Sequence, residues 1–314
     1  MTTMKAVPVH TYGGPEVLVY EEAPCPEVGT EDVLIRVFAT SVNPFDWKVR
    51  EGYLAAWMNH KLPLILGWDV SGVVQTVGSG VTNFSPGDQV FARADVNLDG
   101  AYAEYIAVEA SLVVPKPDSL DHIHAAAVPH AALAAWHSIF SAADLSSGQT
   151  MLIHGAAGGV GHFAVQFAKW RGAKVIGTAS GNNLEFLHQL GVDEAIDYTT
   201  TRFDEVVRDV DVVLDTIGGE VLERCWVVLK PGGMLVSLVE APSEETAIAY
   251  GVRQSFAGAQ ADAGILTQIA ALVDSGQIKP TVSTILPLDE VRQAHELSQS
   301  MHTRGKIVLQ IVDI

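Results

Sequence analysis

Cysteine is nearly missing from this chain. Only Cys25 and Cys225 occur among 314 residues, far apart and without CxxC spacing. This scarcity excludes a disulfide framework and a zinc knuckle built from paired cysteines, and it fits a reducing compartment.

Basic residues are also scarce. The chain has 19 Lys and Arg against 37 Asp and Glu, a formal net charge of −18 at pH 7. Such an excess of carboxylates repels nucleic acid and anionic membrane surfaces. We expect neither nucleic acid nor a membrane as a partner.

Long uncharged apolar runs are missing too. The N-terminus has no apolar segment typical of a secretory signal, and no run reaches membrane-spanning length. Hydrophobic residues nevertheless make up 48% of the chain and charged residues 18%, the composition of a globular protein. The length allows two domains of ordinary size. We expect a cytoplasmic protein.

A glycine-rich turn in the middle of the chain organises the rest. The apolar run 150–154 leads into Gly155-Ala156-Ala157-Gly158-Gly159-Val160-Gly161, beyond which apolar residues recur at helical spacing. In the pattern G-x-x-G-x-x-G the glycines allow a sharp reversal, close approach of a pyrophosphate and close packing of helix on strand. A second apolar strand at 174–178 completes a βαβ unit. This context favours dinucleotide binding over an ordinary turn, with Gly155, Gly158, Gly159, Val160 and Gly161 as the binding residues.

The pattern before this turn is β-rich. Short apolar runs separated by turn residues suggest a barrel or sandwich, with strands at 4–9, 17–20, 33–42, 70–77 and 102–108. A helix is expected at 44–50, with Asn43 as its cap and Pro44 in its first turn. The alanine-rich segment 125–143 predicts one or two further helices.

After residue 150, strands and helices alternate, which predicts a parallel, doubly wound sheet. Strands are expected at 150–154, 174–178, 195–197, 211–215 and 234–239, with helices at 160–171, 183–190, 203–208 and 221–229. The tail adds a helix at 264–273, a strand at 281–286, a helix at 288–300 and a strand at 306–312. The pattern leaves open whether the tail extends the nucleotide-binding sheet or folds back on the N-terminal domain.

Motifs in this order resemble the medium-chain dehydrogenase/reductase superfamily, and within it the zinc-independent, zeta-crystallin-like NADPH:quinone oxidoreductases and their enone-reducing relatives. The matching segments are 41–53 (SVNPFDWKVREGY), 67–74 (GWDVSGVV), 87–91 (GDQVF), 100–105 (GAYAEY), the glycine turn and 304–309 (RGKIVL). The resemblance implies an α/β fold in which a doubly wound parallel Rossmann sheet (126–261) is inserted in a β-rich GroES-like barrel catalytic domain (1–125 plus 262–314). It also implies a homodimer formed through the nucleotide-domain sheets.

The ligands of a catalytic zinc are missing. Zinc-dependent members carry a cysteine within the segment 43–47 and a histidine after Gly67, whereas this chain has no cysteine there and Trp68 after Gly67. We therefore expect no metal, because neither the thiolate nor the imidazole is present. His122, His124, His130 and His137 could be interpreted as a metal cluster, but no cysteine or paired carboxylate joins them, so solvated or hydrogen-bonded histidines are the simpler interpretation.

The end of the second nucleotide-domain strand lacks the carboxylate that would bind a ribose 2′-hydroxyl, because residues 178–184 contain no Asp or Glu. A 2′-phosphate could be bound by the Ser180 hydroxyl and the amides of Asn182 and Asn183, and the resemblance adds Tyr198. We expect NADPH rather than NADH, although many relatives have a Lys or Arg near Asn182 or Asn183 and this chain has none. The asparagines could also cap a helix. The resemblance makes Lys306 a further cofactor contact, and a solvated strand-edge lysine is the alternative.

Without a metal or a Ser/His/Asp constellation, the cofactor has to carry the chemistry. Hydride would pass from NADPH to a small-molecule quinone or to the β-carbon of an α,β-unsaturated carbonyl, and the developing oxyanion needs a hydrogen-bond donor. The resemblance makes Asn43 and Tyr53 the candidates. Asn43 could equally be only a helix cap and Tyr53 only a packing residue. We interpret Asp46 and Asp69 as caps or surface ion pairs.

The leading hypothesis is therefore a zinc-independent, NADPH-dependent quinone or enone reductase. The alternative is an NADPH-binding sensor or scaffold with little turnover, since no residue is indispensable for acid/base chemistry. Short-chain dehydrogenases are set aside because no tyrosine has a lysine four residues later.

Overall fold

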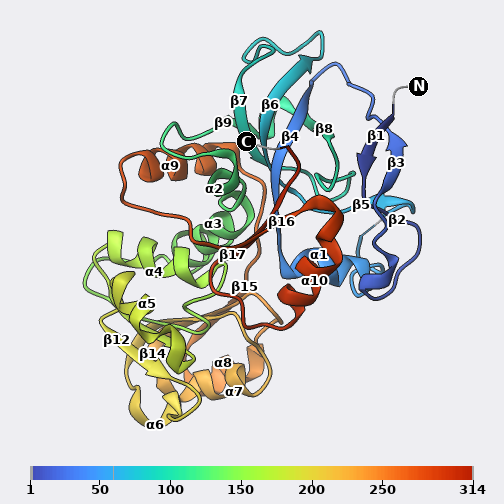
Figure 1. Ribbon diagram of the computed structural model, residues 1–314. Coiled ribbons are helices and arrows are strands. Elements are labelled where there is room, and N and C mark those ends of the chain that lie inside the picture. Colours follow the sequence, from blue (N-terminus) through green and yellow to red (C-terminus); the bar gives the residue numbers. More distant parts are fainter. Residues whose placement is uncertain (1–2, 59, 313–314) are drawn as a thin grey trace. The chain divides into compact units, whose positions relative to one another are not determined.

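The structure is a computed structural model that describes residues 3–58 and 60–312. The chain divides into two compact units (Figure 1). The first comprises Met1–His130, Ala261–Gly276 and Pro280–Ile314, and the second comprises Ala131–Gln260 and Gln277–Lys279. The second unit is thus inserted in the sequence of the first. The domain limits expected above, 1–125 plus 262–314 and 126–261, stay a prediction, because contacts alone do not show which segments fold independently.

The first unit is built on a mixed sheet organised around one long strand, β4 (Asp32–Val42). Val33, Ile35 and Val37 are fully buried, the period-two alternation of a strand with one face in the core. On one side β4 pairs with β6 (Asp69–Val77). On the other side its first half pairs with β8 (Tyr105–Glu109) and its second half with β17 (Lys306–Gln310). In spatial order the strands are β16 (Val282–Pro287), β17, β4, β6, β7 (Gln89–Arg93) and β9 (Val113–Pro115), with β8 beside β4.

Near the N-terminus two short strand pairs replace the strands predicted there. The predicted strand 4–9 is divided between β1 (Thr3–Ala6), which pairs with β3 (Glu21–Pro24), and β2 (Pro8–Val9), which pairs with β5 (Leu64–Ile65). The strand predicted at 17–20 is wrong: Pro15–Val17 form a 3₁₀ turn, and the next strand begins only at Glu21. A proline in the first turn favours such a helical turn over an extended strand.

Helix α1 (Pro44–Arg50) has the bounds that the sequence predicted. Asn43 stands at its N-cap position, and the Asp46 carboxylate accepts a hydrogen bond of 2.8 Å from the Asn43 backbone N–H. The alanine-rich segment forms α2 (His122–Ala126), α3 (Pro129–Trp136) and a π-helical turn (His137–Ala142). The tail helices are α9 (Ala263–Asp274) and α10 (Val291–Gln299).

The second unit contains the predicted parallel sheet, with strands in the order β12-β11-β10-β13-β14-β15. This is the order of a Rossmann sheet, in which the chain reverses direction across the sheet between β10 and β13. The strands are β10 (Thr150–Ile153), β11 (Lys174–Ala179), β12 (Glu194–Asp197), β13 (Val210–Asp215), β14 (Leu229–Ser237) and β15 (Arg253–Phe256). The helices are α4 (Gly161–Trp170), α5 (Leu184–Gln189), α6 (Phe203–Val206), α7 (Glu220–Cys225) and α8 (Glu244–Tyr250).

The sequence pattern did not predict two features of the sheets. The elements α8 and β15 have no predicted counterpart, and the exposed, polar Arg253–Phe256 does not show the apolar run of a buried parallel strand. The question left open for the tail is answered by β17, which pairs antiparallel with β4 and so completes the sheet of the first unit.

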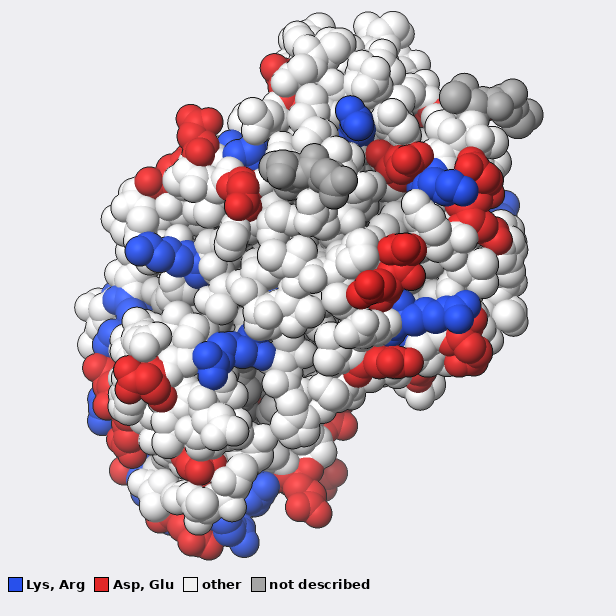
Figure 2. All heavy atoms as spheres, in the orientation of Figure 1, with Lys and Arg blue, Asp and Glu red and all other residues white. Residues whose placement is uncertain are grey.

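The excess of acidic over basic residues is also seen on the surface of the protein. Figure 2 shows acidic side chains spread over one face of the molecule, with basic side chains among them. Both cysteines are free thiols, and Cys225 is buried. No helix in residues 3–58 and 60–312 is long and apolar enough to cross a lipid bilayer.

Candidate functional site

The glycine turn lies where β10 ends and α4 begins, at the point where the order of the parallel sheet reverses. Gly155 adopts φ +61°, a left-handed conformation that favours glycine. At Gly161 a Cβ atom would lie 2.2 Å from the carbonyl oxygen of Gly155 and 2.7 Å from the Cα of Ala156. Because both atoms belong to the backbone, only glycine fits at position 161. The close approach of helix to strand thus requires glycine, and the binding of a phosphate group at this turn stays a prediction.

The predicted 2′-phosphate residues gather at the end of the neighbouring strand, β11. Ser180 follows this strand, and the Asn183 side-chain amide donates to its hydroxyl at 3.1 Å. Tyr198, at the end of β12, donates its backbone N–H to Ala179 at 3.1 Å and keeps 53% of its surface exposed. Asn182 lies in the 3₁₀ turn Gly181–Asn183. Ser180, Asn183 and Tyr198 are therefore close together, at the same edge of the sheet as the glycine turn.

One carboxylate at this edge was missed as a functional candidate. Asp197 ends β12 and reaches across to the turn after β11, where a Cβ on Gly181 would meet its Oδ2 at 2.7 Å. Hydrogen bonds from the side chain and backbone of Thr199 hold the pKa of Asp197 below its usual range, so the group is ionised. The sequence indicated Asp197 only as the last residue of a predicted strand.

In the first unit, Asn43 and Lys306 meet in a buried polar cluster. The Lys306 ammonium donates to the side-chain oxygen of Asn43 and lies 3.6 Å from Asp69 Oδ2. The Asn43 amide donates to the same Asp69 oxygen at 2.9 Å, and the Ser41 hydroxyl also donates to it. Lys306 is only 3% exposed, so its interpretation as a solvated strand-edge lysine is wrong. Its predicted contact with the cofactor stays a prediction.

A chain of hydrogen bonds leads away from the cluster through Asp46. The Arg50 guanidinium can only donate, so His295 Nδ1, 3.0 Å away, accepts and its Nε2–H donates to the Tyr102 hydroxyl at 3.1 Å. Tyr102 in turn donates to Asp46 at 2.9 Å. These hydrogen bonds fix the tautomer of His295 and link helices α1 and α10.

Burial shifts the pKa values of several titratable side chains in this region. It raises the pKa of Asp46 to about 7, and it lowers the pKa of His130 and of His295 to about 3, so both imidazoles are neutral. Burial also lowers the pKa of Lys306, an effect opposed by the Asp69 and Asp46 carboxylates. Asp46 and Asp69 are 1% and 0% exposed, so the interpretation of either as a surface ion pair is wrong.

Tyr53, the second candidate catalytic residue, lies outside this cluster. Its side chain is 62% exposed and packs edge-on against Trp47, with the ring centroids 6.4 Å apart. A hydrogen bond to Glu51 raises the pKa of the Tyr53 phenol. The structure therefore supports a packing contact for Tyr53 and leaves its donor role as a prediction.

The residues present do not fit a catalytic zinc. Within the described residues, no three His, Cys, Asp or Glu side chains are grouped so that they could hold a metal ion. Of the two segments expected to carry zinc ligands in zinc-dependent members, residues 43–47 contain no cysteine and the other has Trp68 after Gly67. Trp68 is buried and donates its indole N–H to the Leu98 carbonyl, and Asn43 binds the Lys306 ammonium. The histidines considered above have separate partners, Ser71 for His122 and Asp121 for His124.

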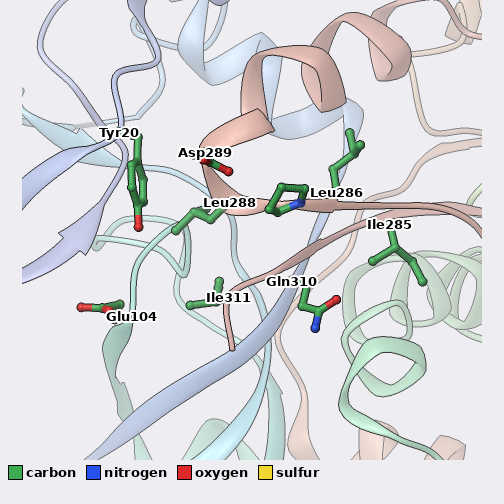
Figure 3. Close-up of a pocket in the computed structure, with 9 residues that line it drawn as sticks. Tyr20, Glu104, Ile285, Leu286, Leu288, Asp289, Gln310 and Ile311 are labelled. Atoms are coloured by element: carbon green, nitrogen blue, oxygen red, sulfur yellow. The ribbon is translucent and has the colours of Figure 1, made fainter. Parts of the chain in front are cut away.

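A separate pocket of about 260 Å³ opens on the first unit (Figure 3). Tyr20, Glu104, Asp289 and Gln310 supply its polar groups, and leucine, isoleucine and proline side chains complete the wall. It contains none of the residues predicted from the sequence. Its wall is formed by the end of β16, the 3₁₀ turn Leu288–Glu290 that precedes α10, the end of β17, and the residues just before β3 and β8.

Two family descriptions match the chain. Residues 29–118 match the alcohol dehydrogenase GroES-like domain, and residues 190–309 match the zinc-binding dehydrogenase family.

Individual proteins match over nearly the whole chain. The mouse (Mus musculus) protein named NAD(P)H oxidoreductase RTN4IP1, mitochondrial, is 35% identical, covering 99% of this chain and 90% of that protein. The Arabidopsis thaliana NADPH-dependent alkenal/one oxidoreductase, chloroplastic, is also 35% identical, covering 98% and 79%. The solved quinone oxidoreductase from Coxiella burnetii superposes with a TM-score of 0.91 at 33% identity, covering 99% and 100%.

Proposed function

Because this chain belongs to the medium-chain dehydrogenase/reductase superfamily, we propose that it is a zinc-independent reductase that uses NADPH to reduce quinones or α,β-unsaturated carbonyls. The family and the oxidoreductase class rest on the comparisons. Two observations support the finer proposal: the second unit has a glycine turn at which position 161 leaves no room for a Cβ, and the first unit has a buried cluster that holds a lysine ammonium on Asn43. The names of the Arabidopsis and Coxiella relatives support the two acceptor classes.

The proposed cofactor site uses the glycine turn and the residues after β11. The backbone of Gly155, Gly158, Gly159, Val160 and Gly161 would hold the pyrophosphate, with the N-terminal amides of α4 facing it. Ser180, Asn182, Asn183 and Tyr198 would bind the 2′-phosphate, and Lys306 would be a further contact. When bound, the reduced nicotinamide supplies a hydride.

The reaction needs one hydride and one proton. For an enone, the hydride forms a C–H bond at the β-carbon, the C=C electron pair moves to the carbonyl oxygen, and the α-carbon then takes a proton from solvent. The overall change is enone + NADPH + H⁺ → saturated ketone + NADP⁺. Asn43 would orient the acceptor and stabilise the negative charge on its oxygen, with Tyr53 as a second donor. Lys306 and Asp69 hold the Asn43 side chain in one orientation.

The first test is NADPH oxidation by the purified protein, followed by the loss of absorbance at the reduced nicotinamide band. We expect turnover with simple quinones or short enones, and less with NADH. The better acceptor series would choose between quinone and enone reductase. Tight NADPH binding without turnover on any acceptor would contradict the proposal and support the sensor or scaffold alternative.

Cofactor preference has its own test in Ser180→Asp. The new carboxylate at the end of β11 would repel a 2′-phosphate and accept from a 2′-hydroxyl, so the ratio of kcat/KM for NADPH to that for NADH should fall by roughly 100-fold. Thr200→Asp adds the same charge at an exposed hydroxyl nearby and should leave the ratio within about threefold of the wild type. An equal fall in both variants would mean that Ser180 does not face the phosphate.

Assembly and compartment complete the proposal. We infer a homodimer in the cytoplasm, with a small-molecule acceptor and no nucleic acid or membrane partner. The resemblance supports the dimer, and so does β15, an edge strand of the parallel sheet whose outer hydrogen-bonding groups could pair with a second copy.

A further inference from the structure

Arg93 is a buried cation that lacks a carboxylate partner. It ends β7 and keeps 7% of its surface exposed. Among the described residues its guanidinium makes one hydrogen bond, from Nη1 to the Ala94 carbonyl at 3.3 Å, and its buried Nε has no hydrogen-bond partner. A buried donor without a partner is destabilising, and most buried polar groups in proteins avoid that state.

The part of the guanidinium without partners has a specific geometry. Nη1 donates one of its two N–H groups to Ala94, so four of the five guanidinium N–H groups have no partner among the described residues, and Nε–H and the Nη2–H beside it are two of these. These two N–H groups point in the same direction and form the fork with which arginine binds the two oxygens of a carboxylate. A carboxylate can give each of them its own straight hydrogen bond, whereas a single oxygen would have to accept from both at poorer angles.

The carboxylates of the protein do not fill this fork. Asp69 stands directly opposite Arg93 on β6, but its two oxygens accept from Ser41, Asn43 and the backbone N–H of His130. Asp95 accepts from the backbone and side chain of Asn97. The described residues contain no ion pair of Arg93 within 4.0 Å.

The surroundings of Arg93 belong to the proposed acceptor site. Residues directly opposite each other on antiparallel strands carry side chains on the same face, so Arg93 lies on the face where Asp69 holds Asn43. Aromatic groups contact one another beside this cluster: Phe45 lies 5.4 Å from Trp68 and 5.9 Å from His130, centroid to centroid. Two cations, Lys306 and Arg93, lie near the carboxylates of Asp69 and Asp46, and burial raises the pKa of Asp46 to about 7, so the cluster has no excess of negative charge that would repel an added anion.

We propose that Arg93 is a substrate-binding residue that binds the carboxylate of the acceptor, and that the acceptor class is α,β-unsaturated carbonyl compounds that carry a carboxylate. The acceptor's ketone oxygen meets Asn43 while its carboxylate meets the vacant fork of Arg93. Asn43 is hydrogen-bonded to Asp69 and Arg93 stands opposite Asp69 on the neighbouring strand, so the acceptor has to place its ketone and its carboxylate within reach of both residues. This inference rests on the proposed function, because it identifies the substrate of that same site.

The test compares a charged acceptor with its uncharged ester. The probes are 4-oxopent-2-enoate and methyl 4-oxopent-2-enoate, each assayed for NADPH-dependent reduction. We expect the wild type to have the higher kcat/KM for the carboxylate, mainly through a lower KM. Turnover of the ester alone would uphold the proposed function and overturn the role of Arg93, whereas turnover of neither probe nor of any quinone would overturn the proposed function itself.

Two variants examine the guanidinium directly. Arg93→Lys keeps the charge but loses the fork, and Arg93→Gln loses both. The carboxylate-to-ester ratio of kcat/KM should fall about tenfold in the first and about 100-fold in the second. Arg36→Gln, at an exposed arginine on β4, is the matched control and should keep the wild-type ratio. A ratio unchanged in both Arg93 variants would overturn the proposal.

A binding measurement makes the result independent of turnover. Calorimetric titration of the wild type with the saturated product 4-oxopentanoate should give saturable binding that 2-pentanone does not give and that Arg93→Lys weakens about tenfold. Because this comparison begins with the wild type, it decides the question even if both variants fold poorly. Equal binding of 4-oxopentanoate and 2-pentanone by the wild type would overturn the proposal.

Discussion

Replacing Gly161 by alanine is expected to raise the dissociation constant for NADPH by roughly 100-fold or more. The new Cβ would lie 2.2 Å from the Gly155 oxygen, 2.7 Å from the Ala156 Cα and 2.9 Å from the Ala156 carbonyl carbon. All three atoms are backbone, so the turn itself must move, and its N–H groups would no longer converge on a phosphate. Titration of the protein with NADPH, followed by nicotinamide fluorescence, measures the effect.

Gly158→Ala is the matched control for this prediction. Its Cβ would meet only the Gly155 oxygen, at 3.2 Å, a contact that a shift of a few tenths of an ångström relieves. We expect a markedly smaller loss of affinity than in Gly161→Ala. If Gly161→Ala bound NADPH within about threefold of the wild type, the turn would not be the phosphate cradle.

Replacing Asp46 by asparagine is expected to change how stability depends on pH. Burial raises the pKa of Asp46 to about 7, above the usual value of about 3.9. Between these two values the folded protein keeps a proton that the unfolded chain releases. The contribution of Asp46 to the free energy of unfolding is therefore fully present below pH 4 and falls as the pH rises through 7, by about 4 kcal/mol in total. Asparagine cannot ionise and should lack this term.

The measurement is urea denaturation of the wild type and Asp46→Asn at several pH values between 4 and 8. The stability of the wild type minus that of the variant should fall steadily up to about pH 7 and then level off. The neutral buried histidines lower stability at acid pH in both proteins, so the difference removes their contribution. Asp118→Asn, at an exposed carboxylate, should show no such trend. A difference that stays constant with pH would mean that Asp46 ionises normally.

The parts of the fold that the sequence predicted are those with local signals. Asn43 and Pro44 indicate the start of α1 within two residues, and the glycine turn with its flanking apolar runs predicts β10, α4 and β11. The placement of β17 beside β4 has no such signal, because it depends on side chains and hydrogen-bonding groups more than 260 residues apart, as in the contact of Lys306 with Asn43 at a separation of 263. The short, polar strand β15 was missed because only its neighbour β14 defines it.

The candidate site also has one part that local sequence signals predict and another that depends on long-range contacts. The glycine turn can be read in order along the chain, whereas the cluster around Asp69 is assembled from distant segments: Asn43 is 26 residues from Asp69, and His130 is 61. Burial cannot be read from a single carboxylate in a sequence, which is why Asp46 and Asp69 were interpreted as caps or surface ion pairs. Arg93 could not be identified from the sequence, because what distinguishes it is that its buried Nε has no hydrogen-bond partner in the structure.

The position of β17 has a consequence for the order in which the protein is made. On the ribosome, the strands β10 to β15 can pair as soon as residue 256 has emerged. The second half of β4, residues 39–42, has to wait for Lys306–Gln310, the segment translated last among these strands. During that interval the edge of β4 is open, and Asn43 has no ammonium to hold its side chain. The first unit is thus begun first and finished last, after the second unit that it encloses in the sequence.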